Sequence, residues 1–375
     1  MRRAARTAPA CLSLAIIAAL AAACGRSIFP SADTSPTPTA TPTPATSALL
    51  YSTNFDGGTI SQFKRNQDSG ALAANGVANA GSKSGPFGIT ANNNFVYVAN
   101  TLDGVYQYKI NQSSGKLSAI GGNSGLVGAG RGSQWVALTP NGSFAYVMNF
   151  GDGSISQYTV QSNGALTANG VTTGLTSPYA AVATGSFLYV TDEGAGTVVS
   201  FPINNDGTLG APTSTRTSGG SSSPGPIVIY PSGQFVYVGD LAGDFVTQLK
   251  VISTGLQFVN VYSGLAVSSA VGGLAIAEPN SSSGNFFLYG SNQTPGTLSI
   301  YVGSTTTGVL STVAMAANGL SGPAGITIDG TNSFLYVANS TANTITRFNI
   351  SASNGALSNP AARATGDTPE NAAIP

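Results

Sequence analysis

One six-residue stretch recurs along the chain and constrains its fold more than any other feature. The segment FVYVAN at residues 95–100 returns as FAYVMN (144–149), FLYVTD (187–192), FVYVGD (235–240) and FLYVAN (334–339). Each copy joins aromatic and β-branched residues to a final Asn or Asp, a pattern typical of a strand that enters a turn. A strand that recurs at intervals indicates a repeat architecture.

Alignment on the tyrosine of this stretch defines seven copies, spaced 43 to 52 residues apart. The aligned residues are Tyr51, Tyr97, Tyr146, Tyr189, Tyr237, Tyr289 and Tyr336. Each tyrosine is followed after three residues by Asn or Asp, and after eighteen or nineteen residues by glycine. In six copies a leucine lies two positions beyond that glycine, whereas in the fifth copy Leu256 directly follows Gly255.

Each unit is predicted to contain four short strands. In the third copy these are residues 135–140, 143–150, 154–160 and the weaker 165–170, separated by turns rich in Gly, Asn and Pro. Such a run is typical of an antiparallel meander. No helical periodicity is found after residue 25.

The strands carry apolar residues on both faces, so each sheet must be covered on both sides. Ile155 and Tyr158, for example, point to opposite faces of one strand. Radial packing of four-stranded sheets buries both faces of every sheet, and seven units predict an all-β, seven-bladed β-propeller. A solenoid is the alternative, but solenoid repeats are generally shorter and need capping units.

The two ends of the repeat region predict how the ring closes. The first unit begins at residue 48 with its second strand, and no apolar first strand precedes it. The last segment, TPENAAIP (368–375), aligns with SPYAAVAT (177–184), a first strand in the middle of the chain. The C-terminal strand should therefore complete the first blade and leave no unpaired edge between first and last blades.

The first 47 residues predict an extracytoplasmic location. A basic start and a short apolar core indicate a signal peptide over residues 1–23, and the small residues before Cys24 resemble the lipobox of bacterial lipoproteins. We expect Cys24 to be acylated, with residues 24–47 as a Pro/Thr-rich stalk and 48–375 as the propeller. The alternatives are ordinary cleavage that leaves a free Cys24, and a merely disordered linker in place of the stalk. The resemblance implies a protein anchored to a bacterial membrane, in the periplasm, at the outer membrane or on the cell surface.

Composition excludes several classes of function. Charged residues make up 7% of the chain and the net charge is zero, which argues against a nucleic-acid partner. The chain has no histidine, the commonest general base and zinc ligand. The Asn and Asp residues after each tyrosine are spread over seven units, so we interpret them as turn caps rather than as a calcium site. No metal, no cofactor and no phosphate-binding loop is predicted.

The repeat motif resembles that of the lactonase-like seven-bladed propellers, which are related to surface propellers with Tyr-Val-Thr-Asn repeats. The resemblance rests on Phe-x-Tyr-Val-x-Asn, a Gly-rich turn, Thr-Ile-x-x-Phe or Ser-Ile-x-x-Tyr, and Gly-x-Leu, and it covers residues 48–375. Enzymes of this family include phosphogluconolactonases and muconate cycloisomerases. The resemblance places a family histidine after a Gly-Pro at the start of an inner strand, where this chain has Phe87.

Candidate site residues are those expected where the inner strands open onto one face of the ring. The predicted set is Phe87, Arg131, Trp135, Tyr179, Glu370 and Asn371. In a ligand site, Arg131 would anchor an acidic or hydroxylated molecule and the aromatic residues would form walls. Glu370 is the candidate base. The alternative is that these aromatic residues only plug the channel or pack between blades.

Two functions remain open on the sequence alone. The first is a monomeric binding or scaffold module of the cell envelope for a protein, a glycan or a small polar ligand. The second is a lactone hydrolase, similar to 6-phosphogluconolactonases, with a histidine-free site. The missing histidine favours binding.

Overall fold

A computed structural model describes residues 49–375, apart from residues 82–84, 123–124, 218–221, 244, 264–269, 280–282, 295 and 317–318. Cys24 and the predicted signal and stalk lie outside the described residues. Within the described part of the chain, no helix is long and apolar enough to cross a membrane.

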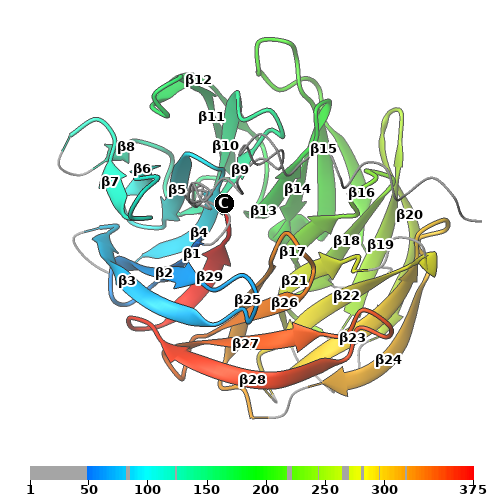
Figure 1. The fold of residues 1–375 in the computed structure, drawn as a ribbon. Helices are drawn as coiled ribbons and strands as arrows, with labels where there is room; N and C mark the ends of the chain where they lie inside the picture. Colours follow the sequence, from blue (N-terminus) through cyan, green and yellow to red (C-terminus); the bar gives the residue numbers. More distant parts are fainter. Residues whose placement is uncertain are drawn as a thin grey trace, which may run out of the picture. The chain divides into compact units, whose positions relative to one another are not determined.

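The described residues form seven antiparallel sheets, which are the blades of a β-propeller (Figure 1). Blade 1 consists of β29 (Pro369–Ala373), β1 (Leu49–Asn54), β2 (Thr59–Arg65) and β3 (Leu72–Asn79). Blade 2 consists of β4 (Pro86–Ala91), β5 (Phe95–Asn100), β6 (Gly104–Ile110), β7 (Leu117–Ala119) and β8 (Leu126–Val127). Blade 3 consists of β9 (Ser133–Leu138), β10 (Phe144–Asn149), β11 (Ser154–Val160) and β12 (Leu166–Thr173).

The remaining four blades follow in chain order, each starting from its innermost strand. Blade 4 consists of β13 (Pro178–Ala183), β14 (Phe187–Asp192), β15 (Thr197–Pro202) and β16 (Thr213–Arg216), with the 3-10 helix η2 (Glu193–Ala195) after β14. Blade 5 consists of β17 (Pro224–Ile229), β18 (Phe235–Asp240), β19 (Phe245–Ile252) and β20 (Gly255–Ser263). Blade 6 consists of β21 (Val271–Ala277), β22 (Asn285–Asn292), β23 (Thr297–Ser304) and β24 (Leu310–Ala316). Blade 7 consists of β25 (Pro323–Ile328), β26 (Phe334–Asn339), β27 (Thr344–Ile350) and β28 (Leu357–Ala364).

The structure confirms the predicted seven-bladed fold, with one local difference. The fourth strand of blade 2 is split into β7 and β8, which both pair with β6. Gly121, Gly122 and Gly125 lie between or beside the two pieces and have positive φ. Positive φ interrupts a regular strand, so the outer edge of this blade bulges.

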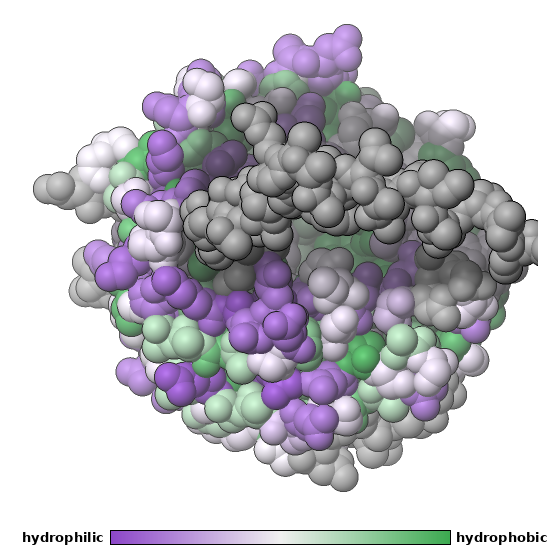
Figure 2. Space-filling model, viewed as in Figure 1, coloured by the Kyte–Doolittle hydropathy of each residue, from purple (hydrophilic) through white to green (hydrophobic). Residues whose placement is uncertain are grey.

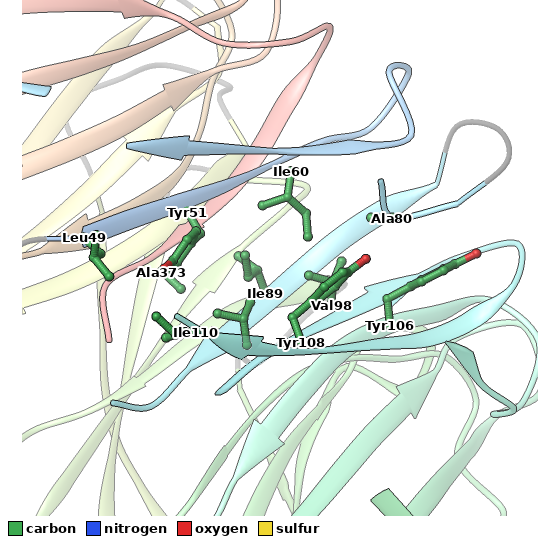
Figure 3. Close-up of a cluster of buried hydrophobic side chains, with 11 residues drawn as sticks. Leu49, Tyr51, Ile60, Ala80, Ile89, Val98, Tyr106, Tyr108, Ile110 and Ala373 are labelled. Atoms are coloured by element: carbon green, nitrogen blue, oxygen red, sulfur yellow. The ribbon is translucent and has the colours of Figure 1, made fainter. Parts of the chain in front are cut away.

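The C-terminal strand closes the ring as predicted. β29 pairs antiparallel with β1, and Tyr51 lies opposite Ala373 in the register. Figure 1 shows the red C-terminal strand beside the blue first strand. Ala373 belongs to the cluster of buried side chains between blades 1 and 2, together with Tyr51, Ile60 and Tyr108 (Figure 3). Closure therefore contributes to the core as well as to the hydrogen bonds of the sheet.

The repeated tyrosine and glycine meet at the seams, by which we mean the interfaces between neighbouring blades. In six seams the tyrosine hydroxyl donates a hydrogen bond of 2.6–2.8 Å to the carbonyl oxygen of the glycine in the next blade. The pairs are Tyr51 with Gly115, Tyr97 with Gly164, Tyr146 with Gly207, Tyr237 with Gly308, Tyr289 with Gly355, and Tyr336 with Gly70. The last pair joins blade 7 to blade 1, so the repeat sequence itself encodes contacts around the ring.

The Asn and Asp residues three positions after the tyrosines cap turns, as predicted. The Asn54 amide donates to the hydroxyls of Thr59 and Ser61 at 2.9 and 3.0 Å, across its own hairpin. Asp192 instead accepts hydrogen bonds from the backbone N–H groups of Thr176 and Ser177 before the innermost strand of its blade. Hydrogen bonding within each blade thus explains why these residue types recur.

Blades 7 and 1 are also joined by a buried ion pair. Arg65 and Asp329 lie 3.2 Å apart, and both side chains are almost completely buried. Asp329 also accepts hydrogen bonds from the backbone N–H groups of Ser333 and Phe334. Removing either partner would leave a buried charge unpaired, which is strongly destabilising, so the pair stabilises the contact between the first and last blades.

Candidate active site at the centre of the ring

The innermost strands of the blades enclose a cavity of about 150 Å³ on the axis of the ring. The lining residues are Phe87, Ile89, Trp135, Tyr179, Pro226, Ile227, Val228, Gly272, Gly273, Leu274, Gly325, Ile326, Asn371 and Ala372. Four of the residues predicted from the sequence therefore meet here: Phe87, Trp135, Tyr179 and Asn371. They come from four different blades, because each blade contributes one innermost strand to the wall.

The aromatic residues form a fixed wall. Phe87 and Tyr179 meet edge to face, with ring centroids 5.9 Å apart, and Phe55 also packs edge to face against Phe87, with centroids 6.4 Å apart. The Trp135 indole N–H donates to the carbonyl oxygen of Ala181 at 3.0 Å. Edge-to-face contacts and a satisfied indole hold these rings in place, so they shape the cavity as well as packing between blades.

Asn371 links the closing strand to the wall. Its side-chain amide donates to the carbonyl oxygen of Phe87 at 3.2 Å, and its backbone N–H donates to the Thr53 hydroxyl at 3.2 Å. The Thr53 hydroxyl donates in turn to the same Phe87 oxygen at 2.9 Å. The position of the wall therefore depends on β29 being in place.

Glu370 lies next to Asn371 at the start of β29, where the innermost strands open. We call this end of the cavity the mouth, and it also carries the loops between the second and third strands of the blades. Glu370 is partly buried and is not among the residues that line the cavity. Burial, and to a lesser extent the negative charge of Asp56, raise the pKa of Glu370 to about 7. A carboxyl group with this pKa can exchange protons near neutral pH.

Tyr179 connects the cavity wall to the carboxyl groups at the mouth. Burial raises the pKa of the Tyr179 phenol well above its usual value, and the negative charges of Glu370 and Glu193 raise it further. A hydrogen bond from the Gln134 side chain acts in the opposite direction and is the smallest contribution. Tyr179 therefore stays protonated over the working pH range and can donate a hydrogen bond.

Arg131 is not brought into the cavity. Its side chain is 84% exposed and forms an ion pair with Asp152, with the guanidinium Nε 2.8 Å from a carboxylate oxygen. Hydrogen bonds from the backbone and side chain of Arg131 lower the pKa of Asp152. Asp152 and Gly130 line a separate, open hollow of about 560 Å³, formed by blade 3 and the segment that leads into it. The predicted charged anchor thus lies at the rim of a different hollow.

Sequence reasoning did not select three polar residues that belong to the mouth: Asp56, Gln134 and Glu193. Glu193, in η2, accepts a hydrogen bond of 2.7 Å from the Ser223 hydroxyl in the next blade. Asp56 accepts one from Thr368, just before the closing strand. Both carboxyl groups lie directly after a second strand, within two residues of the repeated Asn or Asp. Their position in the repeat, rather than their residue type, could have identified these two carboxyl groups from the sequence.

A further hollow, which we call the inner hollow, adjoins the cavity further along the axis. It has a volume of about 390 Å³ and shares Ile89, Trp135, Ile227 and Val228 with the first cavity. Among the described residues that line it, the side chains are aliphatic except for Trp135 and Thr90. The axis of the ring therefore becomes more apolar away from the mouth.

Comparisons with known proteins agree with this architecture. The family model described as "Lactonase, 7-bladed beta-propeller" matches residues 48–373. A structure of a candidate 6-phosphogluconolactonase from Bacteroides fragilis has a TM-score of 0.72 and 20% identity, covering 86% of this chain and 96% of that one. The periplasmic gluconolactonase PpgL of Pseudomonas aeruginosa also has a TM-score of 0.72, with 16% identity, covering 87% of this chain and 99% of that one. No match was found among curated protein sequences.

Proposed function

Because the chain belongs to the lactonase family of seven-bladed β-propellers, we propose that it hydrolyses a lactone at the mouth of the central cavity. The observation that carries this proposal is Glu370, a carboxyl group at the opening of the innermost strand with a pKa raised to about 7. Such a group takes the role of general base that histidine has in many hydrolases. The likeness of the fold to a periplasmic gluconolactonase supports the same class of reaction.

The proposed reaction needs one water molecule and no cofactor. Deprotonated Glu370 removes a proton from water, and the resulting hydroxide adds to the ring carbonyl carbon. The tetrahedral intermediate collapses with cleavage of the ring C–O bond. The proton held by Glu370 passes to the departing alkoxide, which yields a hydroxy acid that ionises in solution.

Tyr179 is suited to stabilise the oxyanion in this reaction. Its phenol stays protonated because burial and the carboxylates at the mouth raise its pKa. A positioned hydrogen-bond donor typically contributes about 10²–10³-fold to acyl transfer. We therefore assign the base to Glu370 and the oxyanion donor to Tyr179.

The test is a proton-release assay with a panel of sugar and aliphatic lactones. We expect kcat/KM of the wild type to rise as pH increases through about 7 and then to level off, since only the deprotonated form of Glu370 is active. Glu370→Gln should lose about 10²–10⁴-fold and the pH dependence with it. Tyr179→Phe should lower kcat and keep the pH profile.

Glu278→Gln is the matched control. Glu278 follows the far end of the innermost strand β21, where it accepts a hydrogen bond from Tyr230, so its replacement should leave the rate unchanged. Wild-type protein without turnover above buffer would exclude hydrolysis and leave the binding module as the function. Equal rates for wild type and Glu370→Gln would exclude Glu370 as the base.

A further inference from the structure

The wall of the central cavity has few polar side chains to offer a substrate. Among the described residues that line it there is no Lys, Arg, Asp or Glu. The Trp135 indole N–H is bonded to Ala181, and the Asn371 amide donates to Phe87. The other side chains of the wall are aliphatic or aromatic, apart from the Asn371 amide oxygen and the Tyr179 hydroxyl, which the proposed reaction uses at the mouth.

This wall is poorly suited to sugar lactones and to phosphorylated lactones. Sugar hydroxyls placed against these side chains would lose hydrogen bonds to water and find few side-chain partners, which costs free energy. A phosphate group needs Arg, Lys or a set of backbone N–H groups. The one arginine predicted for the site, Arg131, is paired with Asp152 at another hollow.

Resting on the proposed lactone hydrolysis, we propose that the substrate is a lactone that carries an alkyl chain on its ring. The ring lies at the mouth between Glu370 and Tyr179, and the chain extends into the cavity. The cavity of about 150 Å³ corresponds to roughly five water volumes, which suits a short chain. Ile227, Leu274 and Ile326 form the contact surface for it.

Trp135 limits how far the preference for longer alkyl chains extends. Trp135 lines both the central cavity and the inner hollow of about 390 Å³ further along the axis, and its indole N–H is bonded to the Ala181 carbonyl oxygen. We therefore expect the benefit of added methylene groups to stop when the first cavity is filled, because a longer chain would meet the Trp135 ring.

The experiment compares γ-lactones whose alkyl chain grows from one to eight carbons with glucono-δ-lactone and its 6-phosphate. Burial of each methylene should raise kcat/KM about threefold to fourfold until the rise stops. Both sugar lactones should be hydrolysed more slowly than the mid-length alkyl lactones. Ile326→Thr should flatten the dependence on chain length. Ile328→Thr, two residues along the same strand and outside the cavity lining, should keep it.

The outcomes separate the two proposals. Rates that are level across the alkyl series, or highest on glucono-δ-lactone or its 6-phosphate, overturn the alkyl assignment and leave hydrolysis in place. Absence of turnover on every lactone overturns hydrolysis. A binding measurement then decides whether the cavity accepts an alkyl chain. For that purpose 2-alkylcyclopentanones, which cannot be hydrolysed, should raise Tm more with each added methylene. A Tm that is independent of chain length overturns the assignment.

Discussion

At the scale of single residues, the seam between blades 4 and 5 differs from the other six. The Tyr189 hydroxyl is buried and has no hydrogen-bond partner among the residues that the structure describes, and neither has the nearby Ser200 hydroxyl. The φ of Gly255 is 134°, whereas the equivalent glycines have φ between 66° and 86°. In the other six copies one residue separates the glycine from the leucine, whereas Leu256 directly follows Gly255, and this shortens the turn between β19 and β20. Its glycine carbonyl therefore does not reach the tyrosine.

This difference predicts that replacing tyrosine by phenylalanine has different effects on stability at two equivalent positions of the repeat. Tyr146→Phe removes the hydrogen bond to Gly207 and should lower the free energy of unfolding by about 1 kcal/mol. Tyr189→Phe removes a buried hydroxyl without a partner and should leave the free energy unchanged or raise it. Urea denaturation of the two variants provides the measurement, and each is the control for the other. Equal losses would mean that Tyr189 does have a partner in solution.

The sequence revealed the repeated tyrosine and glycine but not their contact. The two residues are 61 to 71 positions apart in five of the pairs and 266 apart in the sixth. Spacing within one repeat cannot show that a residue bonds to the next repeat. The deviation at Leu256 was visible from the sequence, and its consequence at Tyr189 required the structure.

Glu370 makes stability depend on pH with a defined sign. Its pKa is about 7 in the folded protein against an ordinary value of 4.5, so the native state binds more protons than the unfolded state between these pH values. Stability therefore falls as pH rises from 4.5 through 7, and the contribution of this group levels off about one pH unit above 7. The loss is roughly 2 kcal/mol, with part of the shift discounted for solvent screening.

Urea denaturation at pH 4.5 and pH 8 tests this effect. The difference in unfolding free energy between Glu370→Gln and wild type should grow in favour of the variant as pH rises. A constant difference between Glu370→Gln and wild type at both pH values would contradict the burial of this carboxyl group.

At the scale of elements, β29 both closes blade 1 and positions the site. Ala373 is buried between blades 1 and 2, while Asn371 and Glu370 stand at the cavity and its mouth. The sequence predicted this strand because 368–375 aligned with an internal first strand. It did not predict the network of Thr53, Asn371 and Phe87, because those residues are brought together only when the ring closes.

A charge in the closing strand should weaken the whole ring. Ala373→Asp places a carboxylate in an apolar cluster and is expected to cost about 3–5 kcal/mol, seen as a large drop in Tm. Ala361→Asp makes the same change at an exposed position of the outer strand β28 and should alter Tm little. If the two variants melt at the same temperature, β29 does not close the ring in solution.

At the scale of the whole molecule, the fold was more predictable than the site. Every blade repeats the same strand order, so seven weak signals add up to one architecture. The site uses single residues from different blades at positions where the repeats differ, and no repeat predicts its neighbour's contribution. Arg131 illustrates this: its position before an innermost strand is right for the mouth, yet Asp152 in the adjoining loop pairs with it. Figure 2 shows hydrophilic and hydrophobic residues interspersed over the coloured part of the visible face.

At the same scale, we propose that the chain is a lipoprotein anchored to a bacterial membrane through Cys24. The basic start, the short apolar core and the small residues before Cys24 support this proposal. In a bacterial host, the mature protein should fractionate with membranes and carry an acylated N-terminal cysteine, detected by mass spectrometry of the N-terminal peptide. Cys24→Ser should release the protein from the membrane fraction, because a single acylation site would be lost. The matched variant Cys11→Ser, within the apolar core, should stay with the membranes. A mature N-terminus at another residue, or an unmodified Cys24, would refute the anchor without bearing on the lactone site.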